Sequence, residues 1–180
     1  MMQFGEAPLG LLAGTAFTLM LASACAFDVR FRRIPNRLVA VLAVGGVLYA
    51  FSSMPFSAAL LQIVGGGAAG LAIWLPFWML RVLGAGDVKL AAAAGVWLGA
   101  GGVVEASLVG AAVGGGIAFW ALARNGGIAA GTARFGAWLV ASRAAGAIGP
   151  ELTPRERRIP YGLAIAAGAV VAAWVPGLIW

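Results

Sequence analysis

The chain has 180 residues, of which 62% are apolar, only 10% are charged and 28 are glycine; its 12 Lys and Arg residues against 6 Asp and Glu give a net charge of +6. Because soluble domains carry about 25% charged residues, this composition excludes that class and indicates a membrane protein. A single cysteine, Cys25, and no histidine exclude a disulfide framework, a four-cysteine zinc site and a C-x-x-C redox pair, so we expect no metal and no cofactor.

A transmembrane helix needs about 20 mainly apolar residues. Apolar runs lie at about 8–27, 38–53, 58–80, 90–123 and 159–180. The 90–123 run is too long for one crossing, so we expect two short spans joined by a hinge at 99–102. The sequence therefore predicts an all-α fold, a single polytopic domain over 1–180 built as a bundle of six transmembrane helices.

Glycine spacing predicts close packing of these helices. Small-x-x-x-small pairs, which let two helix backbones approach, occur at Gly10/Gly14, Gly66/Gly70, Gly95/Gly99 and Gly110/Gly114. Most of the seven tryptophans lie near predicted span ends, where we expect their rings to anchor at the membrane interface.

The basic residues indicate an orientation. If the segment after the first span is cytoplasmic, all twelve Lys and Arg residues fall on the cytoplasmic side, and only Glu6 and Glu105 fall outside. The positive-inside rule then places both termini outside. We expect the basic side to contact anionic lipid headgroups, and we expect no nucleic acid partner. The oligomeric state is left open.

A polar stretch at about 124–158 separates the last two spans and is expected to be a cytoplasmic loop. Within it, Phe135 and Trp138 lie close in sequence to Arg134 and Arg143, which suggests an amphipathic segment at the membrane surface. The alternative is a loop without fixed structure.

Two of the acidic residues differ from the rest. We expect Glu6, Glu105, Glu151 and Glu156 to be solvated carboxylates in or beside loops. Asp28 instead ends the first span, and Asp87 opens the fourth within Gly84-Ala85-Gly86-Asp87-Val88-Lys89, so both are predicted at the same cytoplasmic depth. Two neighbouring carboxylates that share one proton can act as base and acid in peptide hydrolysis. Without side chains, Gly84 and Gly86 leave room for a substrate strand.

A purely structural role is the alternative for each aspartate. Asp28 would then pair with Arg32, about one helical turn later, and Asp87 would cap the fourth span and pair with Lys89 or Arg81.

Three sequence elements favour catalysis. The segment Asp28-Val29-Arg30-Phe31-Arg32-Arg33-Ile34-Pro35-Asn36, then Gly84-Ala85-Gly86-Asp87-Val88-Lys89-Leu90, and finally Ile159-Pro160-Tyr161-Gly162 occur in this order. Together they resemble the motifs of the type IV prepilin peptidases, which are GxGD-type intramembrane aspartyl proteases. The resemblance covers essentially the whole chain.

The resemblance implies a function and assigns residue roles. Asp28 and Asp87 would be the catalytic pair, and the supporting motif residues would be Ile34, Pro35, Asn36, Gly84, Gly86, Lys89, Pro160 and Gly162. The protein would cut the basic leader from a prepilin or pseudopilin at the cytoplasmic face of the bacterial inner membrane. A narrower hypothesis, separate from the resemblance, is that Glu151 or Glu156 meets the leader, while an arginine or Lys89 near the site meets an acidic residue of the mature pilin.

Departures from the family pattern narrow this expectation. Larger members carry an insert with paired C-x-x-C motifs and also N-methylate the pilin, whereas this chain has only Cys25. It therefore resembles the short, peptidase-only members that serve Flp-type (tight-adherence) pili. Leu163 follows Gly162 where many relatives have proline. A small membrane transporter and a non-catalytic assembly partner of a secretion system are the alternative functions.

Overall fold

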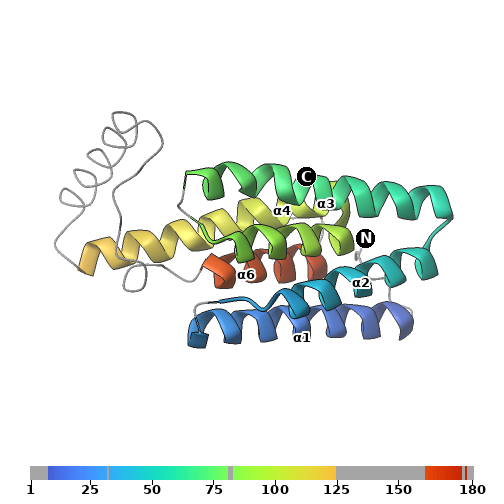
Figure 1. Ribbon diagram of the computed structural model, residues 1–180, viewed down its shortest axis with the longest axis horizontal. Helices are drawn as coiled ribbons and strands as arrows, with labels where there is room; N and C mark the ends of the chain where they lie inside the picture. The colour runs from blue at the N-terminus through green and yellow to red at the C-terminus, as the bar shows by residue number, and fades with distance from the viewer. Residues whose placement is uncertain (1–7, 32, 81–82, 125–160, 176, 178–180) are drawn as a thin grey trace. The chain divides into compact units, whose positions relative to one another are not determined.

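The computed structural model describes residues 8–31, 33–80, 83–124, 161–175 and 177 (Figure 1). Every regular element in these ranges is an α-helix: α1 (Pro8–Phe31), α2 (Asn36–Ser53), α3 (Phe56–Met79), α4 (Ala85–Arg124) and α6 (Tyr161–Trp174). The predicted all-α class is confirmed. Helices α1, α2 and α3, with residues 85–116 of α4, are long and apolar enough to cross a membrane, and α6 is a shorter apolar helix. The count of six spans and the outside termini remain predictions.

The chain divides into two compact units. One comprises residues 1–113 and 160–180, and the other residues 114–159. Of the second unit the structure describes residues 114–124, which continue α4 as a helix. The rest of the predicted loop, including its proposed amphipathic segment, lies outside the described residues.

Prolines mark where α2 and α3 begin. Pro35 precedes α2 with φ −63° and ψ 131°, and its carbonyl oxygen accepts the N–H of Leu38 at 3.0 Å. After α2, Met54 is extended (φ −146°, ψ 162°), as is usual for a residue that precedes proline. Pro55 then precedes α3. Helix α2 starts at Asn36, two residues before the predicted span. The span prediction was based on hydropathy and therefore left out the polar Asn36 and Arg37.

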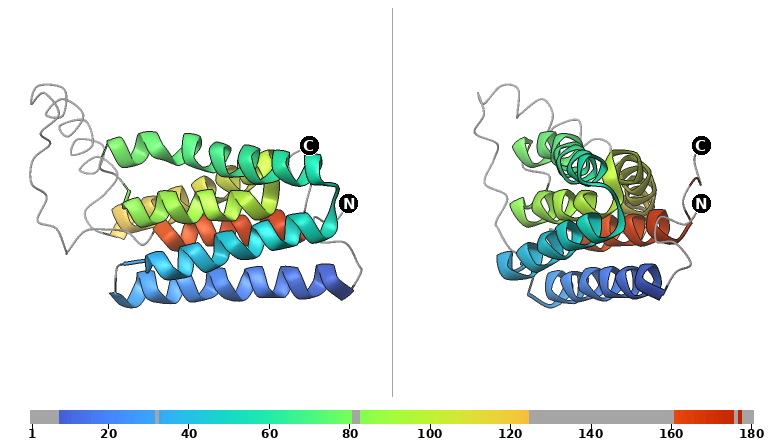
Figure 2. Two further views of the ribbon diagram at one scale, coloured as in Figure 1. Left: turned by 45° about the vertical axis from the view of Figure 1, so that its right-hand side comes forward. Right: turned by 90° about the vertical axis from the view of Figure 1, so that its right-hand side faces the viewer.

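The long apolar run is broken at Gly99. This residue has φ 70° and ψ 178°, a backbone conformation that glycine adopts without a steric penalty. The chain turns back on itself within α4, so its two halves run in opposite directions (Figures 1 and 2). The predicted hinge at 99–102 is confirmed.

Glycines bring two pairs of helices into backbone contact. A Cβ atom on Gly66 of α3 would overlap the carbonyl group of Gly95 in the first half of α4, and one on Gly95 would overlap that of Gly66. In the second half of α4, a Cβ on Gly110 would lie 2.9 Å from the Ala164 oxygen of α6. Small residues therefore set these helix spacings, as the pair spacing predicts.

Two tryptophans belong to the core, which corrects the interface prediction for them. Trp97 is 3% exposed, and its indole N–H donates to the Leu42 carbonyl oxygen at 2.7 Å. Its ring lies against Gly46, where a Cβ would come within 2.8 Å of it. Trp74 is 7% exposed and donates to the Ser107 hydroxyl at 3.0 Å. Packing by neighbouring helices buries each indole, and a polar partner on one of those helices satisfies its N–H.

Glu105 also differs from expectation. It is 3% exposed rather than solvated, and its Oε2 accepts the backbone N–H of Gly177 at 3.4 Å. The reason is the turn at Gly99, which directs the second half of α4 along α6 and encloses this carboxylate beside the residues that follow α6.

Candidate active site

Five helix ends meet at one end of the first unit. The C-terminal ends of α1 and α3 lie there together with the N-terminal ends of α2, α4 and α6 (Figures 1 and 2). Asp28 is in the last turn of α1, and Asp87 is in the first turn of α4. Both aspartates therefore lie at the same end of the bundle, as the span assignment predicts.

Asp28 contacts the start of α6. Its Oδ2 atom accepts the backbone N–H of Gly162 at 3.2 Å, across 134 residues of sequence. The first N–H groups of a helix have no partner within that helix, so the carboxylate satisfies one of them. The side chain of Asp28 is half-buried. Its alternative partner, Arg32, lies outside the described residues.

Asp87 caps the helix on which it lies. Its Oδ2 atom accepts the backbone N–H of Gly84, the residue before α4, at 3.0 Å, and its own N–H donates to the Gly84 carbonyl oxygen at 3.1 Å. An acidic side chain three residues into a helix that reaches back to the preceding N–H is half of a capping box. Asp87 therefore makes the helix cap that was expected if its role were purely structural. This half-buried carboxylate also remains at the helix end where the catalytic hypothesis places it.

The supporting motif residues join the start of α2 to the start of α4. Lys89 Nζ donates to Asn36 Oδ1 at 3.2 Å, and both side chains are exposed. A Cβ on Gly86 would lie 3.4 Å from the Ile34 Cβ, about van der Waals contact, so the segment before α2 packs against the start of α4 at this position. Pro35 occupies the N-cap position of α2. Pro160 lies outside the described residues.

One residue near Asp28 was not identified from the sequence. The thiol of Cys25 donates to the Gly162 carbonyl oxygen at 3.7 Å. Cys25 and Asp28 are three residues apart on α1, a spacing that puts both side chains on one helix face. This spacing is the feature of the sequence that could have linked Cys25 to the site.

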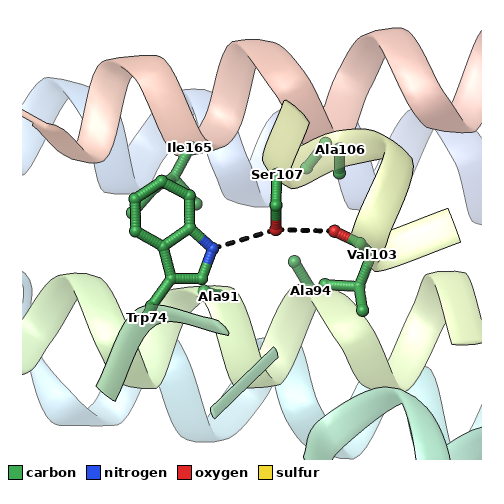
Figure 3. Close-up of a pocket in the computed structure, with 8 residues that line it drawn as sticks. Trp74, Ala91, Ala94, Val103, Ala106, Ser107 and Ile165 are labelled. Atoms are coloured by element: carbon green, nitrogen blue, oxygen red, sulfur yellow. Dashed lines mark hydrogen bonds between the residues drawn. The ribbon is translucent and has the colours of Figure 1, made fainter. Parts of the chain in front are cut away.

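A small cavity lies elsewhere in the bundle. It has a volume of about 10 Å³, roughly the size of one water molecule, and its lining surface is apolar, although Ser107 and Trp74, which border it, are joined by a hydrogen bond (Figure 3). Its other lining residues are Ala91, Ala94, Val103, Ala106, Ile165 and Ala169. Because no carboxylate lines it, this cavity is not part of the candidate active site. Among the described residues, no group of three or more His, Cys, Asp and Glu is placed to hold a metal ion.

The arrangement suits acid–base chemistry at the end of a helix bundle. Two carboxyl groups from different helices lie at one end, and each accepts a backbone N–H at the start of a helix. In both bonds the donor is a backbone N–H group, whose position is fixed by the helix. Each bond therefore restricts the rotation of the carboxylate that accepts it. A base and an acid carried on separate helices can flank a substrate that enters at that end.

Comparison with known proteins identifies relatives of this chain. Residues 15–119 match the type IV leader peptidase family. A prepilin leader peptidase/N-methyltransferase from Klebsiella pneumoniae is 34% identical over 97 residues, which are 49% of this chain and 41% of that protein. A protein of the same name from Dickeya chrysanthemi is 38% identical over 105 residues, 54% of this chain and 35% of that protein. The matches therefore span less than half of each relative. No solved structure matches the chain.

Proposed function

Because the chain belongs to the type IV leader peptidase family, we propose that it is an aspartic endopeptidase that cleaves the leader from prepilins or pseudopilins, with Asp28 and Asp87 as its catalytic pair. The observation that carries this proposal is the placement of both carboxyl groups at one end of the bundle, on α1 and α4, each anchored by one backbone N–H. The curated relatives are named for prepilin processing.

The proposed reaction uses the two carboxyl groups in complementary roles. One carboxylate takes a proton from water as the water oxygen bonds to the scissile carbonyl carbon. The other, protonated, gives its proton to the leaving amine nitrogen as the carbon–nitrogen bond breaks. The proposed starting state requires the two carboxyl groups to come close together, because two close carboxylates hold one proton between them more easily than they ionise together.

We further propose that this end of the bundle faces the cytoplasm of a multi-pass inner-membrane protein. The exposed Arg30, Arg33 and Arg37 lie around the α1–α2 connection at this end, and basic residues accumulate on the cytoplasmic side of membrane proteins. The same side chains are suited to bind anionic lipid headgroups.

The proposed activity is peptide cleavage without N-methylation, as in the short members that process Flp-type prepilins. The 180 residues contain one cysteine and therefore no paired C-x-x-C motif. Both relatives are named as methyltransferases as well, and the matches cover 41% and 35% of their lengths.

Co-expression with a prepilin tests the proposal. Asp28→Asn and Asp87→Asn change one carboxyl to an amide of nearly the same shape and keep an oxygen that can accept the backbone N–H. Each variant should accumulate in the membrane and leave the precursor at full length on a gel. Glu105→Gln makes the same chemical change at a carboxylate that the proposal leaves outside the reaction, and it should process normally. Cleavage by either aspartate variant would disprove the proposed pair.

A further inference from the structure

Two hydrogen bonds hold the first turn of α6 against α1, and both involve the main chain of Gly162 on α6. Gly162 donates its N–H to Asp28 Oδ2 at 3.2 Å and accepts the Cys25 thiol at its carbonyl oxygen at 3.7 Å. Since Cys25 and Asp28 lie on one face of α1, they present one donor and one acceptor side by side. The two side chains thus match the two polar groups of the Gly162 main chain.

This contact leaves no room for a side chain at Gly162. An added Cβ atom would lie 2.7 Å from Asp28 Oδ2 and 3.1 Å from its Cγ, and Gly162 is buried. Any larger residue must therefore move either the carboxylate or the helix. The close approach, rather than an unusual backbone conformation, is what requires glycine here.

Contacts along α6 fix its position relative to the rest of the first unit. Near its C-terminal end, the Trp174 indole N–H donates to the Thr18 hydroxyl of α1 at 3.1 Å. In its middle, a Cβ on Gly168 would overlap the Ala106 carbonyl oxygen of α4. Since α6 is one continuous helix between these contacts, Gly162 has little freedom to slide away from Asp28.

We propose that Gly162 is a positioning residue that orients the carboxyl group of Asp28 for catalysis, and that the Cys25 thiol holds Gly162 in place for this task. This inference rests on the proposed peptidase function. A backbone N–H on Oδ2 restricts rotation of the carboxyl group, which fixes the direction in which it meets water or substrate. Reacting groups must be placed accurately, because a displacement of about 1 Å can lower a rate about 100-fold.

Two glycine variants separate positioning from general stability. Gly162→Ala places a Cβ against Asp28, whereas Gly46→Ala places one 2.8 Å from Trp97 in the core of the first unit. In purified protein acting on a prepilin peptide, Gly162→Ala should lower kcat by about 10-fold to 100-fold with KM changed less than about twofold. Gly46→Ala should lower the unfolding temperature and leave kcat within about twofold of the wild type at a temperature where the protein is folded.

Substitutions at Cys25 test the second half of the proposal. Cys25→Val keeps a similar volume but removes the donor, and should lower kcat several-fold. Cys25→Ser keeps a hydroxyl donor and should recover most of that loss. A role in packing alone would give the reverse order, because valine fills the space of the thiol better than serine does.

The outcomes distinguish this inference from the function on which it rests. Wild-type kcat in folded Gly162→Ala, while Asp28→Asn is inactive, would overturn the positioning role and leave the peptidase proposal intact. Cleavage by Asp28→Asn would instead overturn the peptidase proposal. If Gly162→Ala does not fold, the order of Cys25→Val and Cys25→Ser decides: lower kcat for valine supports positioning, and equal or higher kcat overturns it.

Discussion

Gln62 caps the first half of α4, which ends at the break at Gly99. Its side-chain amide on α3 donates to the Trp97 carbonyl oxygen at 2.9 Å and also to that of Val96 at 3.4 Å. These carbonyls come just before the break at Gly99, where the last carbonyl groups of a helix have no partner within it. A side chain from the neighbouring helix thus supplies the hydrogen bonds that the turn removes.

Replacing Gln62 by leucine should therefore destabilise the turn. Gln62→Leu keeps most of the side-chain volume but leaves two carbonyl oxygens without this donor, at a cost of about 1 kcal/mol or more. Thermal unfolding in detergent micelles should show a lower Tm. Leu61→Ala, at a neighbouring side chain that is 75% exposed, is the control and should leave Tm nearly unchanged. An equal Tm for Gln62→Leu and the wild type would contradict the capping role.

Two adjacent glycines on α3 should respond in opposite ways to alanine. A Cβ on Gly66 would overlap the Gly95 carbonyl group, so Gly66→Ala should push α3 and α4 apart at a cost of about 1–3 kcal/mol. A Cβ on Gly65 meets its nearest neighbour, the Ala100 Cβ, at 3.9 Å. Gly65→Ala should therefore be neutral or stabilising by up to about 1 kcal/mol, because alanine favours helix. Equal Tm values for the two variants would show that this close approach does not determine stability.

Much of the helix arrangement was predictable because local sequence determines it. The break at Gly99 follows from an apolar run too long for one crossing and from the glycines within it. The common end for Asp28 and Asp87 follows from counting spans, since each crossing reverses the chain. Neither inference needs knowledge of which helices touch.

The contacts between helices were not predictable in the same way. Trp97 and Glu105 are buried because of the helices that pack over them, and their own sequence neighbourhoods resemble those of interface residues. The contact between Gly162 and Asp28 spans 134 residues, and Gln62 acts on a turn 35 residues away. Hydropathy and spacing carry no information about such partners. The sequence motifs therefore included Gly84 and Gly162, but they did not predict that the N–H groups of these glycines contact the two aspartates.

Asp87 should show both a catalytic and a structural effect, and two variants separate them. Asp87→Asn keeps an oxygen that can accept the Gly84 N–H, so the start of α4 should remain capped while cleavage is lost. Asp87→Ala removes the cap as well and should lower stability by a further amount of about 1 kcal/mol. The checks are gel-based cleavage and Tm for each variant. Equal Tm values for the two would show that the cap contributes nothing, and an active Asp87→Asn would remove the catalytic role.

Glu105 should contribute to stability from the opposite end of the bundle. A solvated carboxylate at a loop tolerates alanine with a change within about 0.5 kcal/mol, but this side chain is 3% exposed and accepts the Gly177 N–H. Glu105→Ala leaves that N–H without its acceptor and opens space between α4 and the residues after α6, so it should cost about 1–3 kcal/mol. Glu105→Gln keeps an acceptor oxygen and should lose less. In detergent the expected order of Tm is wild type, then glutamine, then alanine. Wild-type Tm for the alanine variant would mean that this carboxylate faces water after all. Because the contact holds the chain just beyond the C-terminal end of α6, the loss should appear in unfolding rather than in the position of the cleaved bond.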